Sequence, residues 1–442
     1  MQIAFYTLGC KVNQFESWAI QDAFLRHGCT VVNYREAADI YIVNTCTVTS
    51  RAAYQSRQII RRLRRERPDA KIIATGCHVQ TDASTVLESA GTGVCLAGNP
   101  QKHLIAEQAL KSEKSGCTGI FITDISRQKT ISPLFLHRPP ANRTRAYLKI
   151  QDGCNAFCTY CIVPYARGRS RSLPPEDAIR QVDIFSKAGI REIVVTGIHV
   201  GHYGKDLKDP MDLLMLLDRL CHKFKHISFR LSSIEPTEIS PQFIKWAAET
   251  DNFCPHFHIP LQSGSDTVLA AMNRHYSASF FLEILESIAE SIKNCCIGTD
   301  VMTGFPTERS EDFQATAALL ETAPVSYVHA FPYSSRPGTV AEAMKPVCSG
   351  IEAKERAALV REIGMRKRRT FFERFAREKL DVLVEKRSRD TGLFTGYTPN
   401  YLPVYIESDK DLKDLRNRHV KVQIDRIDNR GLYGKIYSKA HH

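Results

Sequence analysis

The sequence predicts an α/β protein in three parts: a small doubly wound parallel sheet, a partial α/β barrel, and a small C-terminal β-barrel. Three observations predict this. Short apolar strands alternate with helical patterns from the first residues, the alternation restarts on a larger scale near residue 146, and short strands with turn signals follow residue 378. We therefore expect domains at residues 1–138, 139–378 and 379–442.

The first domain is predicted from apolar strands that each precede a helical pattern, which favours a parallel sheet. The connection at residues 111–145 contains glycine and several prolines, and we expect it to carry an extra strand pair. Expected strands are residues 3–8, 40–44 and 71–75, and expected helices are residues 15–27, 52–67 and 84–90.

The middle domain has six candidate strands, too few for a closed eight-stranded barrel, so a partial barrel is expected. A charged helix at residues 350–378 leads out of it. The strands are residues 147–150, 192–196, 226–231, 257–260, 298–303 and 327–331, and helices are expected at 175–188, 211–220, 240–250, 277–291 and 310–323.

The last domain reads as short strands separated by Gly and Asn turn signals, which is typical of a small β-barrel. Small barrels of this kind often bind oligonucleotides. The expected strands are residues 381–386, 392–397, 403–406, 420–427 and 432–438.

Composition narrows the function. The chain is 43% hydrophobic and 24% charged, as in ordinary globular proteins, and no apolar run reaches the roughly 18–20 residues of a membrane span. The first residues do not resemble an export signal, so we expect a cytoplasmic protein without a membrane partner. Fourteen cysteines then favour thiolate ligation, and a net charge of +12 favours a polyanionic partner. We expect that partner to be RNA and expect no DNA partner.

Three cysteines, Cys154, Cys158 and Cys161, are spaced three and then two residues apart. A cubane iron–sulfur cluster normally takes four thiolates, so three local ones leave an iron open for chemistry. A zinc site, which would lack a nearby fourth ligand, and disulfides are the alternatives. The spacing resembles the signature of the radical S-adenosylmethionine (SAM) superfamily, in which the open iron binds SAM.

Another three cysteines, nearer the N-terminus, each follow a predicted strand: Cys10, Cys46 and Cys77. The carboxyl ends of parallel strands lie along one edge of a sheet, so these side chains are expected to meet there. The alternative interpretation is that each of these cysteines is a small apolar residue buried in the core. Gly9 and Gly76 precede two of them and suit tight turns.

The motifs around Cys10, Cys46 and Cys77 resemble those of the methylthiotransferases, a family with a cluster-binding domain, a radical SAM barrel and a TRAM domain. The resemblance extends over essentially the whole chain. It is carried by TLGCKVNQFE (residues 7–16), NTCTV (44–48), TGC (75–77), HIPLQSGSD (258–266), DVMTGFP (300–306) and YSSRPGT (333–339).

The resemblance implies two 4Fe-4S clusters, one held by each trio, and SAM as cosubstrate. It implies methylthiolation of carbon 2 of an adenosine in a tRNA anticodon stem-loop, with a reducing electron donor and a sulfur source. The GCKVN form of the first motif is most similar to the subgroup that acts on threonylcarbamoyladenosine. The alternatives are isopentenyladenosine in tRNA, an aspartate of a ribosomal protein, or a non-catalytic RNA-binding protein with structural clusters.

Residues for SAM are expected near the carboxyl ends of the barrel strands. The superfamily usually has Gly-Gly-Glu where this chain has Thr-Gly-Ile (residues 196–198), so a backbone carbonyl is expected to substitute. For the loop residues, a capping role is the alternative, and no catalytic residue beyond the cluster ligands is assigned. The candidates are Tyr160, Thr196, Gly197, Ser232, Ser233, Glu235 and Gln262.

Residues for RNA are expected on basic surfaces. Residues 57–67 place Ile59, Ile60 and Leu63 on one helical face with arginines around the rest, which suits phosphate binding or simply a solvated helix. Cations and aromatics mix in the C-terminal domain, as on RNA stacking surfaces or an ordinary barrel exterior. The candidates are Arg57, Arg61, Arg64, Arg366, Arg369, Arg387 and Lys421.

Overall fold

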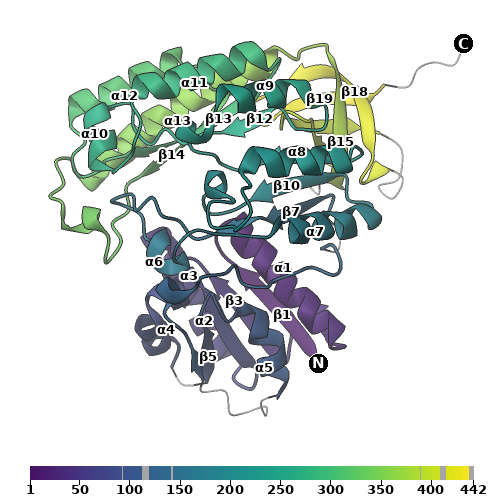
Figure 1. Ribbon diagram of the computed structural model, residues 1–442, viewed down its shortest axis with the longest axis vertical. Coiled ribbons are helices and arrows are strands. Elements are labelled where there is room, and N and C mark those ends of the chain that lie inside the picture. Colours follow the sequence, from purple (N-terminus) through teal and green to yellow (C-terminus); the bar gives the residue numbers. More distant parts are fainter. Residues whose placement is uncertain (92, 112–118, 141–142, 389, 409–414, 438–442) are drawn as a thin grey trace, which may run out of the picture.

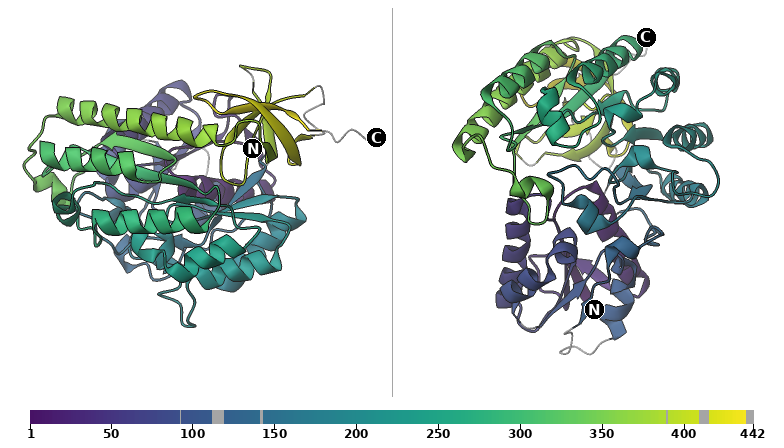
Figure 2. Two further views of the ribbon diagram at one scale, coloured as in Figure 1. Left: turned by 90° about the horizontal axis from the view of Figure 1, so that it is seen from above. Right: turned by 60° about the vertical axis from the view of Figure 1, so that its left-hand side comes forward.

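The structure is a computed structural model that describes residues 1–91, 93–111, 119–140, 143–388, 390–408 and 415–437. In Figure 1 the N-terminal sheet lies at the bottom, the barrel strands lie above it, and the C-terminal strands lie at the upper right. The views of Figure 2 show the long helices α11 (Ala278–Ser291), α12 (Ser310–Thr322) and α13 (Gly350–Glu373) side by side along one side of the barrel. The expected fold class is confirmed.

The N-terminal domain is a six-stranded parallel sheet of order β2-β1-β3-β4-β5-β6, and it contains every strand expected in its first 80 residues. The elements that the sequence did not predict are two to seven residues long, and such short segments carry little periodicity. The strands are β1 (Gln2–Thr7), β2 (Thr30–Val32), β3 (Ile40–Thr45), β4 (Lys71–Gly76), β5 (Val94–Ala97) and β6 (Ile120–Phe121); the helices are α1 (Lys11–Arg26), α2 (Ser50–Glu66), α3 (Cys77–Thr81), α4 (Ala83–Ala90) and α5 (Ile105–Lys111).

Two expectations for this domain are wrong. Helix α1 begins at Lys11 rather than Phe15, because Cys10 is extended and occupies the N-cap position. The extra strand pair expected within residues 111–145 is absent from the described part of that segment, where only the two-residue β6 precedes Arg145. Prolines at 133, 139 and 140 lack the N–H that a ladder needs.

The partial barrel consists of two three-stranded parallel sheets, β7-β10-β11 and β12-β13-β14. Isolated bridges between Phe229 and Phe253 and between Ser233 and His258 join them into one curved wall. Apolar residues on the outer face pack against the helices. The strands are β7 (Arg145–Lys149), β10 (Glu192–Thr196), β11 (Ser228–Leu231), β12 (His256–His258), β13 (Cys296–Thr303) and β14 (Tyr327–Pro332); the principal helices are α7 (Pro175–Lys187), α8 (Leu213–Lys223), α9 (Pro241–Glu249), α11 (Ala278–Ser291) and α12 (Ser310–Thr322).

The charged helix α13 (Gly350–Glu373) ends five residues before the predicted boundary, in a turn where Arg377 has a φ of 63°. The C-terminal domain is a closed barrel of order β15-β16-β17-β19-β18, as expected. Its strands are β15 (Lys379–Arg387), β16 (Phe394–Tyr397), β17 (Pro403–Glu407), β18 (His419–Ile427) and β19 (Leu432–Ile436).

The C-terminal barrel covers the amino ends of the first barrel strands. Arg145, the first residue of β7, lies 3.0 Å from Glu385 of β15, and Arg230 donates to the carbonyl of Pro399 at 2.8 Å. The ring of Tyr401 packs against Arg230, with the guanidinium carbon 4.6 Å from its centroid. This end of the partial barrel is therefore closed by a loop of the C-terminal domain.

Across the described ranges, no helix combines the length and apolar character needed to cross a membrane.

Candidate active site

The first trio, Cys10, Cys46 and Cys77, meets at the carboxyl edge of the sheet, after the adjacent strands β1, β3 and β4. Cys46 and Cys77 are buried and Cys10 is exposed. Burial, together with the neighbouring charges of Cys77 and Cys10, raises the pKa of Cys46 to about 11. Three thiols in mutual electrostatic contact form a site that favours a metal over three free thiolates.

Two glycines make this meeting possible. Gly76 has a φ of +100°, and a Cβ there would lie 2.4 Å from the carbonyl oxygen of Thr45. Gly9 also has a φ of +100°, and a Cβ there would lie 3.1 Å from the sulfur of Cys46. Any side chain at either position would strain the backbone and push the strand ends apart.

The second trio, Cys154, Cys158 and Cys161, lies on the loop between β8 (Gln151–Asp152) and α6 (Val163–Arg167). Its backbone is held by Asn273, whose side chain donates to the carbonyls of Ala156 and Phe157 at 3.1 and 3.2 Å. Burial raises the pKa of Cys161 to about 12, and the charges of Cys158 and Cys154 contribute. The structure thus brings this trio together as well.

Two basic residues contact the second trio and were missed in the sequence. The Nδ1 of His199 lies 3.2 Å from the sulfur of Cys154, and its Nε2 lies 2.6 Å from Glu238. Arg274 donates to the sulfur of Cys158 at 3.6 Å and forms an ion pair with Glu235 at 2.6 Å. Both residues lie in loops far from the cysteine motif in the sequence, so the spacing of that motif does not predict their contact with it.

A cavity of about 200 Å³ lies beside the second trio, where the N-terminal domain meets the barrel. Its lining is mainly apolar, which suits an aromatic or thioether group. The lining residues are Val48, Thr49, Tyr160, Cys161, Ile162, Val163, Gln262, Met302, Phe331, Pro332, Tyr333 and Ser334.

The two domains are bridged next to this cavity. Arg336 donates to the hydroxyl of Thr47 at 2.7 Å, and the amide of Ser50 donates to Ser334 at 3.1 Å. Thr47 directly follows Cys46, so the first trio is tied to the loop after β14.

Gln262 is the predicted SAM residue with the clearest sign of an absent ligand. It lines the cavity, its φ is +67°, and it is only 8% exposed. Its side-chain oxygen is buried without a hydrogen-bond partner in the described chain. A buried unpartnered amide and a strained backbone are both costly, and both are typical of ligand sites.

The other predicted SAM residues have mixed surroundings. Tyr160 lines the cavity, whereas the Thr196 carbonyl already accepts the Ile150 amide at 2.9 Å. Glu235 is engaged by Arg274 and caps the short turn after it, as the alternative reading proposed. Gly197 packs closely on Gln151, because a Cβ at Gly197 would lie 2.9 Å from the Gln151 side chain. Ser232 is buried, whereas Ser233 is exposed.

A buried network of charged side chains lies between the two trios. Each of its six members is under 10% exposed in its side chain. Glu16 contacts Lys102 and lies 2.7 Å from Lys149 and 2.5 Å from Arg167. The members are Glu16, Lys102, Lys149, Asp152, Arg167 and Arg171.

The arginines of α2 and α13 that were predicted to bind RNA already form hydrogen bonds or ion pairs with other residues of the chain. Residues 59, 60 and 63 of α2 are buried as expected, but Arg61 and Arg64 donate to backbone carbonyls at 2.9 and 2.7 Å. Arg57 lies 3.1 Å from His78. On α13, Arg366 pairs with Glu321 and Arg369 with Glu373; both arginines remain exposed.

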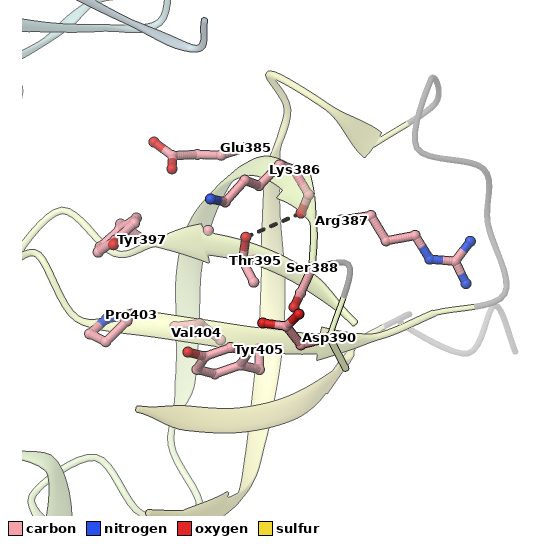
Figure 3. A pocket seen from close by; sticks show the side chains of 11 residues that line it. Glu385, Lys386, Arg387, Ser388, Asp390, Thr395, Tyr397, Pro403, Val404 and Tyr405 are labelled. Carbon is pink, nitrogen blue, oxygen red and sulfur yellow. Dashed lines mark hydrogen bonds between the residues drawn. The ribbon is translucent and has the colours of Figure 1, made fainter. Parts of the chain in front are cut away.

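The C-terminal barrel has an open pocket of about 490 Å³ between β15, β16 and β17 (Figure 3). Tyr397, Tyr405 and the stem of Lys386 line it, while the Arg387 side chain extends away from the tyrosines. Tyr405 stacks on Tyr433 at 4.7 Å between ring centroids. Aromatic faces beside cations suit stacked bases. Lys421, on β18, is also exposed.

Family models match this chain in three places. The radical SAM superfamily model matches residues 148–320, and the TRAM domain model matches residues 373–437. A model described as Uncharacterized protein family UPF0004 matches residues 2–98. The fold and these matches define a radical SAM enzyme with a TRAM domain.

Similar proteins narrow the class. A threonylcarbamoyladenosine tRNA methylthiotransferase (MtaB) of Bacillus subtilis is 36% identical over 96% of this chain and 93% of its own length. The MtaB of Aquifex aeolicus is 35% identical over 94% of this chain and 99% of its own. A tRNA-2-methylthio-N(6)-dimethylallyladenosine synthase of Bartonella tribocorum is 31% identical over 94% and 93%. The chain belongs to the radical SAM methylthiotransferase family.

Among solved structures, the radical SAM methyltransferase TsrM of Kitasatospora setae is similar with a TM-score of 0.56 and 14% identity, over 77% of each chain. At that identity the likeness concerns the fold.

Proposed function

We propose that this chain adds a methylthio group to carbon 2 of threonylcarbamoyladenosine next to the anticodon of tRNA. The observation that carries the proposal is the convergence of two separate cysteine trios on one domain interface. The nearly full-length similarity to the two MtaB proteins, and the GCKVN motif at Cys10, support this adenosine over others. The reaction would take place in the cytoplasm.

Three features of the chain fit two 4Fe-4S clusters. Each trio offers three thiols close enough to influence one another's pKa, and three ligands leave one iron of a cubane open. Gly9 and Gly76 let the strand ends that carry the first trio approach one another, where a Cβ would overlap neighbouring atoms. Basic side chains contact Cys77, Cys154 and Cys158, as expected next to anionic clusters.

In the proposed reaction, bound SAM and the clusters would supply radical chemistry at one trio and the sulfur at the other. The chain's own residues hold and orient the reactants. Gln262 would donate to or accept from SAM in the apolar cavity, and Tyr160 would pack against it. Arg336 and Ser50 keep the two trios on facing surfaces. The half-buried tyrosines Tyr397 and Tyr405 and the nearby cations of the C-terminal barrel would bind the anticodon stem-loop.

The two-cluster part is tested by iron and sulfide analysis of the full chain after anaerobic reconstitution. We expect about eight irons per chain, and roughly four after either trio is replaced by alanine. Four irons in the unmodified chain would contradict two clusters. An electron donor and a sulfur source must be supplied in any assay of turnover.

The substrate is tested by nucleoside mass spectrometry of tRNA from a strain that lacks the gene. We expect the methylthio form of threonylcarbamoyladenosine to disappear and to return with the gene. Loss of methylthio-isopentenyladenosine instead would favour the activity named for the Bartonella relative. An unchanged tRNA profile with an altered ribosomal protein would favour the aspartate substrate. Protein that binds tRNA but forms no 5′-deoxyadenosine from SAM would favour a non-catalytic role.

A further inference from the structure

We propose that Arg167 is a positioning residue for the N-terminal cluster, which it holds against the loop of the second trio and whose reduction it favours. This rests on the proposed two-cluster function. Arg167 is the last residue of α6, the helix that begins two residues after Cys161, yet its Nε donates to the sulfur of Cys77 at 3.3 Å. One side chain therefore connects both cysteine trios.

The guanidinium is fixed by its remaining donors. One terminal nitrogen lies 2.5 Å from Glu16, and the other donates to Asn13, which itself donates to the carbonyls of Leu8 and Thr45 at 2.7 and 3.0 Å. Those carbonyls lie next to the glycine and cysteine positions of the first trio. Arg167 is fully buried, so water cannot replace these contacts.

Asp152 completes the connection on the other side. Its carboxylate lies 3.3 Å from Arg167 and accepts the amide of Gly153 at 2.9 Å, one residue before Cys154. A shift of the second loop would move Asp152 and so the guanidinium that contacts Cys77. Arginine suits this role because its planar fork can bind several acceptors in one fixed geometry.

The charges of the network are unbalanced in a direction that suits a cluster. Four cations face two carboxylates, a surplus of two positive charges among the ion-paired groups. Asp206 also acts on Arg171 but forms no ion pair within the described residues. Buried charge is costly unless paired. Three thiolates on a cubane make an anionic assembly, and an added electron makes it more anionic.

It follows that the network stabilises the bound cluster and, more strongly, its reduced form. The contact from Arg167 to Cys77 also belongs to the class of hydrogen bonds to ligand sulfur that adjust cluster potentials. Removing the positive charge should lower the reduction potential of the N-terminal cluster and leave the other cluster's potential nearly unchanged.

The test uses the full chain with Cys154, Cys158 and Cys161 replaced by alanine, so that only the N-terminal cluster can form. Arg167→Gln and Arg167→Lys are added separately, and the potential is measured by a redox titration followed by electron paramagnetic resonance. We expect Arg167→Gln to change the reduction equilibrium at least tenfold toward the oxidised form, about 59 mV for one electron. Arg167→Lys, which keeps the charge but not the fork, should give a smaller shift.

Arg356→Gln is the matched control. Arg356 is also a buried arginine, 2.6 Å from Glu308, but it contacts neither trio. It should destabilise the chain without shifting the potential. An unchanged potential in Arg167→Gln, or equal shifts in Arg167→Gln and Arg356→Gln, would overturn the proposal. If Arg167→Gln does not fold, a wild-type potential in Arg167→Lys overturns it, and a negative shift supports it.

The parent chain separates this proposal from the one on which it rests. If the alanine-substituted parent binds no iron, the two-cluster function fails. If it binds about four irons and only the Arg167 variants behave like the control, the two-cluster function stands and the role of Arg167 fails.

Discussion

Replacement of Asp152 by asparagine removes one negative charge from the buried network and keeps the shape of the side chain. The asparagine oxygen can still accept the Gly153 amide, so the loss is mainly electrostatic. Lys149, at 2.6 Å, and Arg167, at 3.3 Å, lose a counter-charge in a site without water access. The variant should therefore be less stable than the parent at neutral pH.

The magnitude follows from the pKa of Asp152. Burial acts to raise this pKa, but Lys149 and Arg167 outweigh burial and hold it at about 2, against an ordinary value of 3.8. That depression corresponds to about 2 kcal/mol at neutral pH. Breaking a buried ion pair typically costs about 3–5 kcal/mol. We expect Asp152→Asn to lower the free energy of unfolding by about 2–5 kcal/mol.

The pH dependence has a defined sign. A carboxyl whose folded pKa is depressed contributes its full stabilisation above the unfolded pKa, and this is lost as the pH falls through the folded pKa. The difference between parent and variant should therefore be constant from about pH 8 to pH 5 and shrink only below about pH 4.

The assay is urea unfolding of the cluster-free chain followed by tryptophan fluorescence. The chain has two tryptophans, and in a Trp246→Phe background Trp18 is the reporter. Trp18 stacks on Tyr147 at 4.8 Å, at the contact between α1 and β7. Asp183→Asn is the control, because Asp183 pairs with Lys187 on the surface and should contribute under about 1 kcal/mol. A loss for Asp152→Asn no larger than the control, or one that grows in acid, would refute the reasoning.

Three further predictions concern the cluster, SAM and RNA. Gly76→Ala should abolish iron binding by the first trio, measured as about four irons lost, because its Cβ would overlap the Thr45 carbonyl; Gly28→Ala, with an open site at φ +77°, should keep all iron. Gln262→Ala should weaken SAM binding roughly three- to tenfold by calorimetry, the value of one hydrogen bond; unchanged affinity would exclude it from the site. Lys421→Gln should lower the slope of tRNA affinity against salt concentration by about 1, and an unaltered slope would place Lys421 outside the RNA surface.

The sequence predicted the long elements and the meeting of Cys10, Cys46 and Cys77, because strand ends follow from local alternation. It did not predict the groups that surround the trios. Arg167 and Cys77 are 90 positions apart, and Arg167 and Glu16 are 151 apart. Such contacts depend on how two domains pack, which no local period encodes. Gln262 was a candidate because it lies just after a barrel strand, at the end where ligands bind in this class of fold, and its contact with SAM stays a prediction.

The contacts of the Tyr401 loop with Arg145 and Arg230 affect how experiments that delete domains of this enzyme can be interpreted. The C-terminal barrel is part of the wall of the catalytic domain, so deleting it would leave Arg145 without Glu385 and expose the ends of β7 and β11 to solvent. A truncated enzyme that loses activity would therefore not reveal whether RNA capture or catalysis had failed. Point substitutions on the outward face, such as at Lys421, separate the two, and exchange of this domain between relatives would have to carry the matching barrel residues with it.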